Sequence, residues 1–144
     1  MEKSKNKEII IPVIKMLNDI IEKKANQSFK KFDITFTQLR VVLLLSYNQD
    51  KIYSLKELEE IFNVSQQTMA GIIKRLELKR LVENVKNPND RRIKKVKITE
   101  KGKILAKKTE DKMFENENML CNCLDEEERE IFCKLLKKIY NSLK

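Results

Sequence analysis

The chain has 144 residues, a length that fits one domain of ordinary size. Its 31 Lys and Arg residues exceed its 22 Asp and Glu residues, for a net charge of +9, while a hydrophobic share of 41% excludes a disordered chain. The sequence contains no histidine and only two glycines, which excludes histidine-dependent hydrolases, zinc proteases of the H-E-x-x-H type and glycine-rich phosphate loops. We therefore expect a protein that is not an enzyme.

The predicted elements begin with three helices. Apolar residues at helical spacing predict a first helix over residues 10–31. Thr35 and Ser54 each stand three residues before a glutamine or glutamate, a capping-box pattern that predicts a second helix ending near residue 48 and a third helix after Ser54. Ser65 is the predicted N-cap of a fourth helix.

After Leu81 the apolar residues alternate instead of following a helical period, and residues 87–90 read Asn-Pro-Asn-Asp, a composition typical of turns. This pattern predicts a two-stranded β-hairpin with Arg91 and Arg92 at its tip. Thr99 is the predicted N-cap of a fifth helix that ends near Cys121. Asp125, with Glu128 three residues later, predicts the start of a sixth helix. The expected fold is mainly α with one small β-hairpin.

The positive charge is concentrated in one stretch of the chain. Residues 65–98 contain 10 basic and 3 acidic residues, a net charge of +7, whereas residues 100–144 contain 10 of each. Such a segment is equally consistent with a solvated basic surface and with nucleic-acid binding. The order of the elements favours the second interpretation, because a capped helix followed by a basic hairpin is the winged helix-turn-helix arrangement.

Each part of this arrangement has a predicted role on double-stranded DNA. Gln66, Gln67 and Thr68 begin the fourth helix and offer side chains that can read base edges in the major groove. The hairpin tip suits the narrow minor groove and its phosphates. Asp90 is expected to pair with a neighbouring arginine or to start the turn, and Gly71 to permit either close approach to DNA or tight helix packing. The candidate DNA-binding residues are Ser65, Gln66, Gln67, Thr68, Lys74, Arg75, Lys86, Asp90, Arg91, Arg92, Lys94 and Lys95.

Three segments give the chain a resemblance to the MarR family of transcription regulators. They are residues 58–77, which contain the fourth helix, residues 87–92, which read Asn-Pro-Asn-Asp-Arg-Arg, and residues 96–102, which read Val-Lys-Ile-Thr-Glu-Lys-Gly. The resemblance implies a homodimer that binds a pseudo-palindromic operator, usually as a repressor released by a small-molecule effector or by oxidation. It also implies that Arg92 enters the minor groove and that Asp90 steadies it.

The resemblance also predicts how the chain is organised. Residues 1–34 and 100–144 are expected to supply dimerisation helices, and residues 35–99 the winged helix-turn-helix lobe that contacts DNA. The chain departs from the family pattern at Arg80, where many members have glycine after the recognition helix. A left-handed arginine is costly, which favours a different geometry for this helix end. Asn84 and Asn87 stand where many members have arginine and aspartate.

Two groups of residues are candidates for a control input. The resemblance implies an effector crevice near Phe29, Phe32, Phe36 and Tyr47, although packing into the core is the simpler explanation of these residues. Cys121, Cys123 and Cys133 are candidate redox residues, with inert thiols as the simpler interpretation and a zinc site as a weaker one.

Nothing else in the sequence indicates a cofactor, a metal or a membrane. The longest apolar run, residues 41–45, is far below the roughly 18 residues of a spanning helix, and the N-terminal segment does not read as a signal peptide. An odd number of cysteines makes no disulfide framework, so we expect a cytoplasmic protein. The leading hypothesis is a sequence-specific DNA-binding repressor; the alternatives are a thiol-based redox-sensing regulator and a winged-helix module that binds protein.

Overall fold

The computed structural model describes residues 9–86, 89–90 and 92–144, so that Asn87, Pro88 and Arg91 of the predicted hairpin lie outside the described residues. The chain divides into two compact units, residues 1–110 and residues 111–144. Within the described ranges no helix is long and apolar enough to cross a membrane. The first unit contains α1 (Ile10–Phe29), a short 3-10 helix (Lys30–Phe32), α2 (Phe36–Tyr47), β1 (Tyr53–Ser54), α3 (Leu55–Phe62), α4 (Gln66–Leu78), β2 (Val82–Val85), β3 (Lys95–Ile98) and the first half of α5 (Glu100–Cys121).

The predicted helix starts are confirmed, because the capping hydrogen bonds are present. The backbone N–H of Gln38 donates to Thr35 Oγ1 at 3.2 Å, and the Gln38 side chain accepts from the Thr35 backbone at 3.3 Å. Ser54 and Glu57 form the same reciprocal pair at the start of α3. These bonds satisfy backbone donors that a helix leaves free in its first turn.

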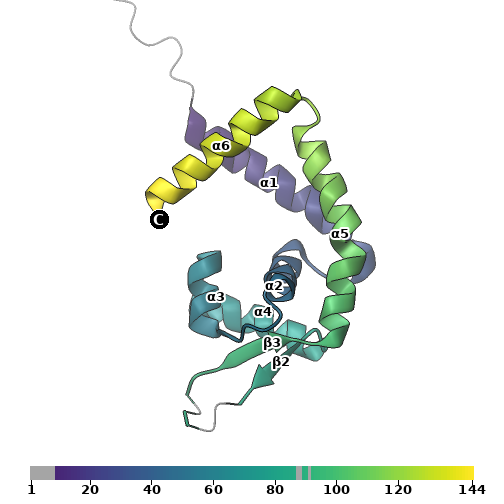
Figure 1. Ribbon diagram of the computed structural model, residues 1–144, viewed down its shortest axis with the longest axis vertical. Coiled ribbons are helices and arrows are strands. Elements are labelled where there is room, and N and C mark those ends of the chain that lie inside the picture. Colours follow the sequence, from purple (N-terminus) through teal and green to yellow (C-terminus); the bar gives the residue numbers. More distant parts are fainter. Residues whose placement is uncertain (1–8, 87–88, 91) are drawn as a thin grey trace, which may run out of the picture. The chain divides into compact units, whose positions relative to one another are not determined.

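The sheet has three strands rather than the two that the sequence predicted. Its order is β1-β3-β2, with every neighbour antiparallel, so β3 is the central strand and Tyr53 pairs with Val96. The backbone N–H of Leu55, the residue after β1, donates to the carbonyl of Lys94 at 3.1 Å. The sequence missed β1 because two residues are too short for an alternating pattern. Figure 1 shows β2 and β3 running together at the edge of the lobe that holds α3 and α4.

The end of α4 corrects the expectation for Arg80. This residue adopts the left-handed conformation, with φ of 59°, where a different helix end was expected. The backbone N–H of Arg80 donates to Glu77 O at 2.9 Å, and that of Leu81 donates to Leu76 O at 3.0 Å. Together the two bonds form a Schellman motif, which glycine usually ends. The Arg80 carbonyl also accepts the Thr99 hydroxyl at 2.7 Å, so a tertiary contact holds the strained residue in place.

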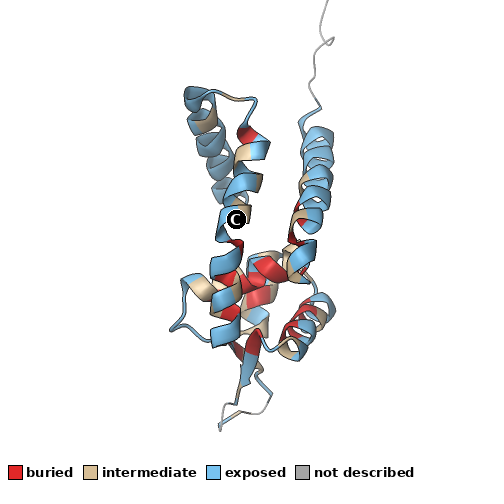
Figure 2. Ribbon diagram, turned by 90° about the vertical axis from the view of Figure 1, so that its right-hand side faces the viewer, coloured by how far each residue is buried: buried red, intermediate tan, exposed pale blue. Residues whose placement is uncertain are grey.

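The core of the first unit lies between its short helices and the sheet, where Figure 2 shows the buried residues gathered. The largest fully buried side chains come from every layer of the lobe: Phe29, Leu39, Leu45, Leu58, Met69, Ile73, Leu76 and Val96. Gly102, in the first turn of α5, packs against this layer so closely that an added Cβ would lie 2.3 Å from the carbonyl oxygen of Leu81. Only glycine fits at this crossing.

The second unit contains the second half of α5 and α6 (Glu126–Leu143). Asp125 caps α6 as predicted, because the backbone N–H of Glu128 donates to its carboxylate at 2.8 Å. This hydrogen bond lowers the pKa of Asp125, since it favours the charged carboxylate. No residue of α6 is buried, and its large apolar side chains are 37–82% exposed.

Candidate nucleic-acid interface

The first turn of α4 presents polar side chains to solvent. Gln66, Gln67 and Thr68 are all exposed. Ser65 Oγ accepts the backbone N–H of Thr68 at 3.1 Å and donates to Thr68 Oγ1 at 2.9 Å, which orients that hydroxyl. Within the described part of the chain, the amides of Gln66 and Gln67 have no side-chain hydrogen bond that would occupy them. Both amides are thus available to an external donor or acceptor.

The exposed face of α4 continues with cations. Lys74 and Arg75 are exposed, and neither forms an ion pair with any residue that the structure describes. Gly71 lies one turn before Arg75 on the same helix. A Cβ added at Gly71 would meet nothing within 4 Å, which rules out helix packing within this chain as the reason for the glycine.

The hairpin contains two kinds of lysine. Lys94 Nζ lies 2.9 Å from Glu77 Oε1 of α4, and Lys97 Nζ lies 3.2 Å from Glu83 Oε1 on the neighbouring strand. In contrast, Lys86, Lys95 and Arg92 form no ion pair with the described residues. The predicted role of Lys94 therefore changes, because its ammonium already holds the hairpin against α4 and is only partly free to bind an anion.

Asp90 starts the turn, which is the second of its two predicted roles, while its pairing with Arg91 stays a prediction. Its carboxylate accepts the backbone N–H of Arg92 at 2.9 Å, which is the hydrogen bond that starts an Asx turn. Between Asp90 and the Arg92 guanidinium the structure has no ion pair. Asp90 thus fixes the backbone of Arg92, and the guanidinium is left exposed. The other arginine of the tip, Arg91, lies outside the described residues.

A groove of about 480 Å³ joins the helices to the hairpin. The three elements that line it are the start of α3, the start of α4 and the segment before β3. Its lining residues are Ser54, Leu55, Lys56, Glu59, Gln66, Arg92, Ile93 and Lys94. The structure thus brings Gln66 and Arg92 to one surface, although 25 residues lie between them in the sequence.

Lys56 is the functional candidate that the sequence did not reveal. It is exposed in the first turn of α3 and lines the groove together with Gln66 and Arg92. Its place beside the hairpin depends on the pairing of β1 with β3, which no sequence pattern indicated. The capping box at Ser54 fixed the turn that carries Lys56, but not what lies opposite it.

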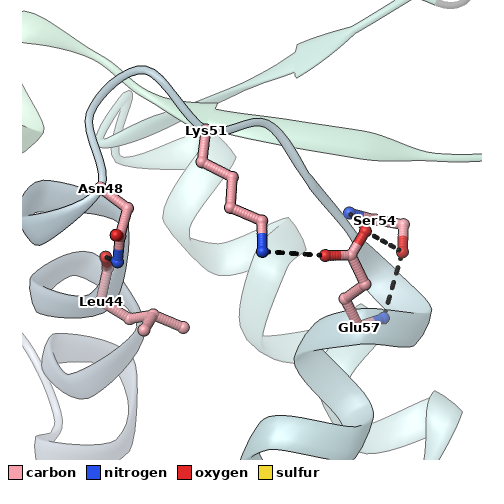
Figure 3. A network of polar contacts seen from close by, with 5 residues as sticks. All are labelled: Leu44, Asn48, Lys51, Ser54 and Glu57. Carbon is pink, nitrogen blue, oxygen red and sulfur yellow. Dashed lines mark hydrogen bonds and ion pairs between the residues drawn. The ribbon is translucent and has the colours of Figure 1, made fainter.

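The turn that carries Lys56 is held by a polar network, drawn in Figure 3. The backbone N–H of Glu57 donates to Ser54 Oγ at 3.1 Å. The Glu57 carboxylate also lies 3.6 Å from Lys51 Nζ, from the loop before β1. Asn48 ends the preceding helix with a hydrogen bond of 3.3 Å from its side-chain amide to the Leu44 carbonyl. These contacts fix both ends of the connection between α2 and α3.

The aromatic residues proposed for an effector crevice separate into two groups. Phe29 is fully buried, and its ring centroid lies 6.4 Å from that of Phe36 and 6.3 Å from that of Phe32. Tyr47 lies at the other end of α2 and is 79% exposed. Three of the four residues are therefore brought together, and the burial of Phe29 favours core packing for that ring.

The three cysteines are free thiols of the second unit. Cys121 is buried at the end of α5, while Cys123 and Cys133 are exposed. Across the described ranges, no group of three or more acidic, cysteine or histidine side chains is placed to hold a metal ion. A redox role for these thiols stays a prediction.

Comparison with known proteins finds sequence similarity over part of the chain. A family model described as "MarR family" matches residues 32–93. The chain is 30% identical over 97 residues to the HTH-type transcriptional regulator SarZ of Staphylococcus haemolyticus, a match covering 65% of each chain. It spans about 65% of the length of the curated relatives that it matches.

Two solved structures share the fold over nearly the whole chain. The S. aureus protein MepR, solved in complex with DNA, is 25% identical with a TM-score of 0.84, over 94% of this chain and 98% of that chain. A mutant of MarR from E. coli, solved in complex with operator DNA, is 26% identical with a TM-score of 0.80, over 94% and 99%. With its three-stranded winged sheet and capped α4, the chain is similar to the MarR family of winged-helix transcriptional regulators.

Proposed function

We propose that this protein is a transcriptional regulator that binds double-stranded DNA as a homodimer, at a pseudo-palindromic operator. The observation that carries the proposal is the groove in which Gln66 of α4, Arg92 of the hairpin and Lys56 of α3 line one surface. Relatives of similar fold have been solved with DNA bound, which supports the same partner here.

The polar and charged residues divide the work of recognition. Gln66 and Gln67 are the candidates for base reading, because a glutamine amide can donate to and accept from adenine in the major groove. Arg92 is the candidate for the minor groove, where a narrow A·T-rich segment concentrates negative potential. Lys56, Lys74, Arg75, Lys86 and Lys95 would contact phosphates, and binding should therefore weaken steeply as salt rises.

The second copy of the chain would be held by the terminal helices, residues 1–34 and 100–144. In α6 no side chain is buried, and α1 buries only Ala25 and Phe29, both near its C-terminal end. Apolar side chains that stay exposed on two long helices are the composition of an obligate dimer interface. A dimer would present two copies of α4 to half-sites about 34 Å apart, one turn of B-DNA.

Repression is the regulatory direction that we propose. A dimer bound across an operator would act as a repressor by occupying the promoter, and a small-molecule effector would release it. Phe32 and Phe36, which are half-buried beside Phe29, stay the candidate effector contacts.

The test compares three alanine variants on two duplexes, one selected by the wild-type protein from a random pool and one with that sequence scrambled. Fluorescence anisotropy gives the dissociation constants. Arg92→Ala should weaken binding to both duplexes by a similar factor. It should also reduce the slope of the logarithm of the binding constant against the logarithm of the salt concentration by about 1. Gln66→Ala and Gln67→Ala should weaken binding to the selected duplex about tenfold, since one base contact contributes about 1–3 kcal/mol. Binding to the scrambled duplex should hardly change.

Lys97→Ala is the matched control, because Lys97 is a hairpin cation already paired with Glu83. It should change neither dissociation constant by more than about twofold. Equal losses on both duplexes for all three test variants would contradict the assignment of base reading to Gln66 and Gln67. If the wild-type protein bound no duplex even at low salt, the winged lobe would instead be a protein-interaction module.

A further inference from the structure

No packing contact within the chain requires glycine at position 71. It lies in the middle of α4, and a Cβ built on it would meet no atom within 4 Å. The other glycine of the sequence, Gly102, is required because a Cβ there would collide with the Leu81 carbonyl. Only one of the two glycines is thus explained by packing within the chain.

A glycine in the interior of a helix is unfavourable, because it loses more backbone entropy on folding than alanine does. Elsewhere α4 follows the rules for a stable helix, with a serine cap at Ser65 and four buried apolar residues on one face. The backbone of Gly71 has ordinary negative φ, so the helix geometry does not need glycine either. The remaining explanation for the glycine is the space that its missing side chain leaves at the surface of the helix.

The position of that space is informative. Residues four apart lie on the same face of a helix, so Gln67 precedes Gly71 by one turn and Arg75 follows it by one turn. Both neighbours are exposed. The missing side chain therefore lies between an amide that suits a base edge and a guanidinium that suits a phosphate.

We infer that Gly71 is a specificity-determining residue, whose missing side chain lets the floor of the major groove approach the α4 backbone. This inference rests on the proposed function. If Gln67 reads the adenine of an A·T pair, the thymine of a neighbouring or same pair presents its C5-methyl group on the same floor. The space at Gly71 is the size of a methyl group or larger, and that methyl group is its expected occupant.

The first experiment compares Gly71→Ala and Gly71→Leu with the wild-type protein on the selected and scrambled duplexes. Gly71→Ala should weaken binding to the selected duplex at least tenfold, and Gly71→Leu should weaken it further. The affinity for the scrambled duplex should change by less than about threefold. Both substitutions should raise the melting temperature, Gly71→Ala by about 3 °C, because they remove a helix-interior glycine. A variant that is more stable but binds its operator less tightly cannot be explained by misfolding.

Leu78→Ala serves as the matched control. Leu78 lies on the same exposed face but at the far end of α4, away from the turn that begins with Gln66. Its truncation should leave both dissociation constants within about twofold, because base contacts come from the N-terminal part of a recognition helix.

The second experiment replaces each thymine of the selected duplex, one at a time, with deoxyuridine, which lacks only the C5-methyl group. At one position per half-site this change should weaken the wild-type complex and restore most of the affinity lost by Gly71→Ala. If Gly71→Ala keeps wild-type affinity and selects the same site, the inference is wrong and the proposed function stands. An equal loss on both duplexes would also overturn it, and a wild-type protein that bound no DNA would overturn both.

Discussion

The winged lobe and α6 contain similar apolar residues but differ in how far they bury them. In the lobe, Leu58, Met69 and Ile73 are completely buried by neighbouring elements of the same chain. In α6, Leu135 is 50% exposed and no residue is buried at all. Burying one large apolar side chain contributes roughly 1.5–3 kcal/mol, so the lobe obtains this stabilisation within the chain. The difference indicates that apolar burial within the chain stabilises the lobe, whereas α6 has no comparable burial.

The largest expected effect is in the lobe, at Gly102. We expect Gly102→Ala to lower the free energy of unfolding by about 3 kcal/mol, since its Cβ must displace a backbone carbonyl rather than a mobile side chain. Urea unfolding followed by circular dichroism at fixed protein concentration measures the change. Gly71→Ala adds the same methyl group where there is space, and it should shift the midpoint the opposite way. An unchanged midpoint for Gly102→Ala would mean that the α5 crossing is loose.

The next effect is in α6 and concerns association rather than folding of the lobe. Leu135→Glu should raise the dissociation constant of the proposed dimer about 30-fold, equivalent to about 2 kcal/mol, because a charge would have to be buried. Sedimentation equilibrium across a range of concentrations gives this constant.

Lys137→Gln is the control for this change, because it alters the charge by the same amount on the opposite face of the helix. It should leave the dissociation constant nearly unchanged. A Leu135→Glu protein that dimerised like the wild type would place the interface elsewhere and remove the contrast between the two regions.

The smallest effect is expected at Arg80, where the lobe carries strain. Arg80→Gly should increase the free energy of unfolding by about 1 kcal/mol, because glycine adopts a left-handed conformation without a Cβ penalty. Thermal unfolding by calorimetry gives the shift. Asn63→Gly, at another left-handed helix end with φ of 50°, should gain less, since asparagine tolerates this conformation. Destabilisation by Arg80→Gly would indicate that the arginine side chain contributes a contact that outweighs the strain.

The sequence was sufficient for those features that depend on local chemistry. Thr35, Ser54, Ser65 and Asp125 cap their helices as predicted, because a cap depends on residues only three positions apart. The alternation on either side of residues 87–90 likewise predicted the paired strands β2 and β3, since strand periodicity is visible in a few residues.

Features that depend on distant residues were beyond the sequence. The ion pair of Lys94 with Glu77, the strand at Tyr53 and the place of Lys56 in the groove all depend on tertiary packing. The left-handed Arg80 is tolerated because the Thr99 hydroxyl and the Leu81 backbone hold the chain there, against the local preference of arginine. The sequence predicts Tyr47 beside the phenylalanines at the junction of the first two helices, but Tyr47 ends α2, a helix of 12 residues that begins with Phe36.

Lys94 connects three elements of the lobe at once. Its carbonyl accepts the N–H of Leu55 at the start of α3, and its ammonium pairs with Glu77 of α4. Arg92 is only two residues away along the chain. If the proposed function holds, the lobe fixes the distance between α4 and Arg92. It therefore sets the number of base pairs between the bases that α4 reads and the minor groove that Arg92 reaches. An operator half-site with one base pair inserted between these two contacts would satisfy one of them only by losing the other.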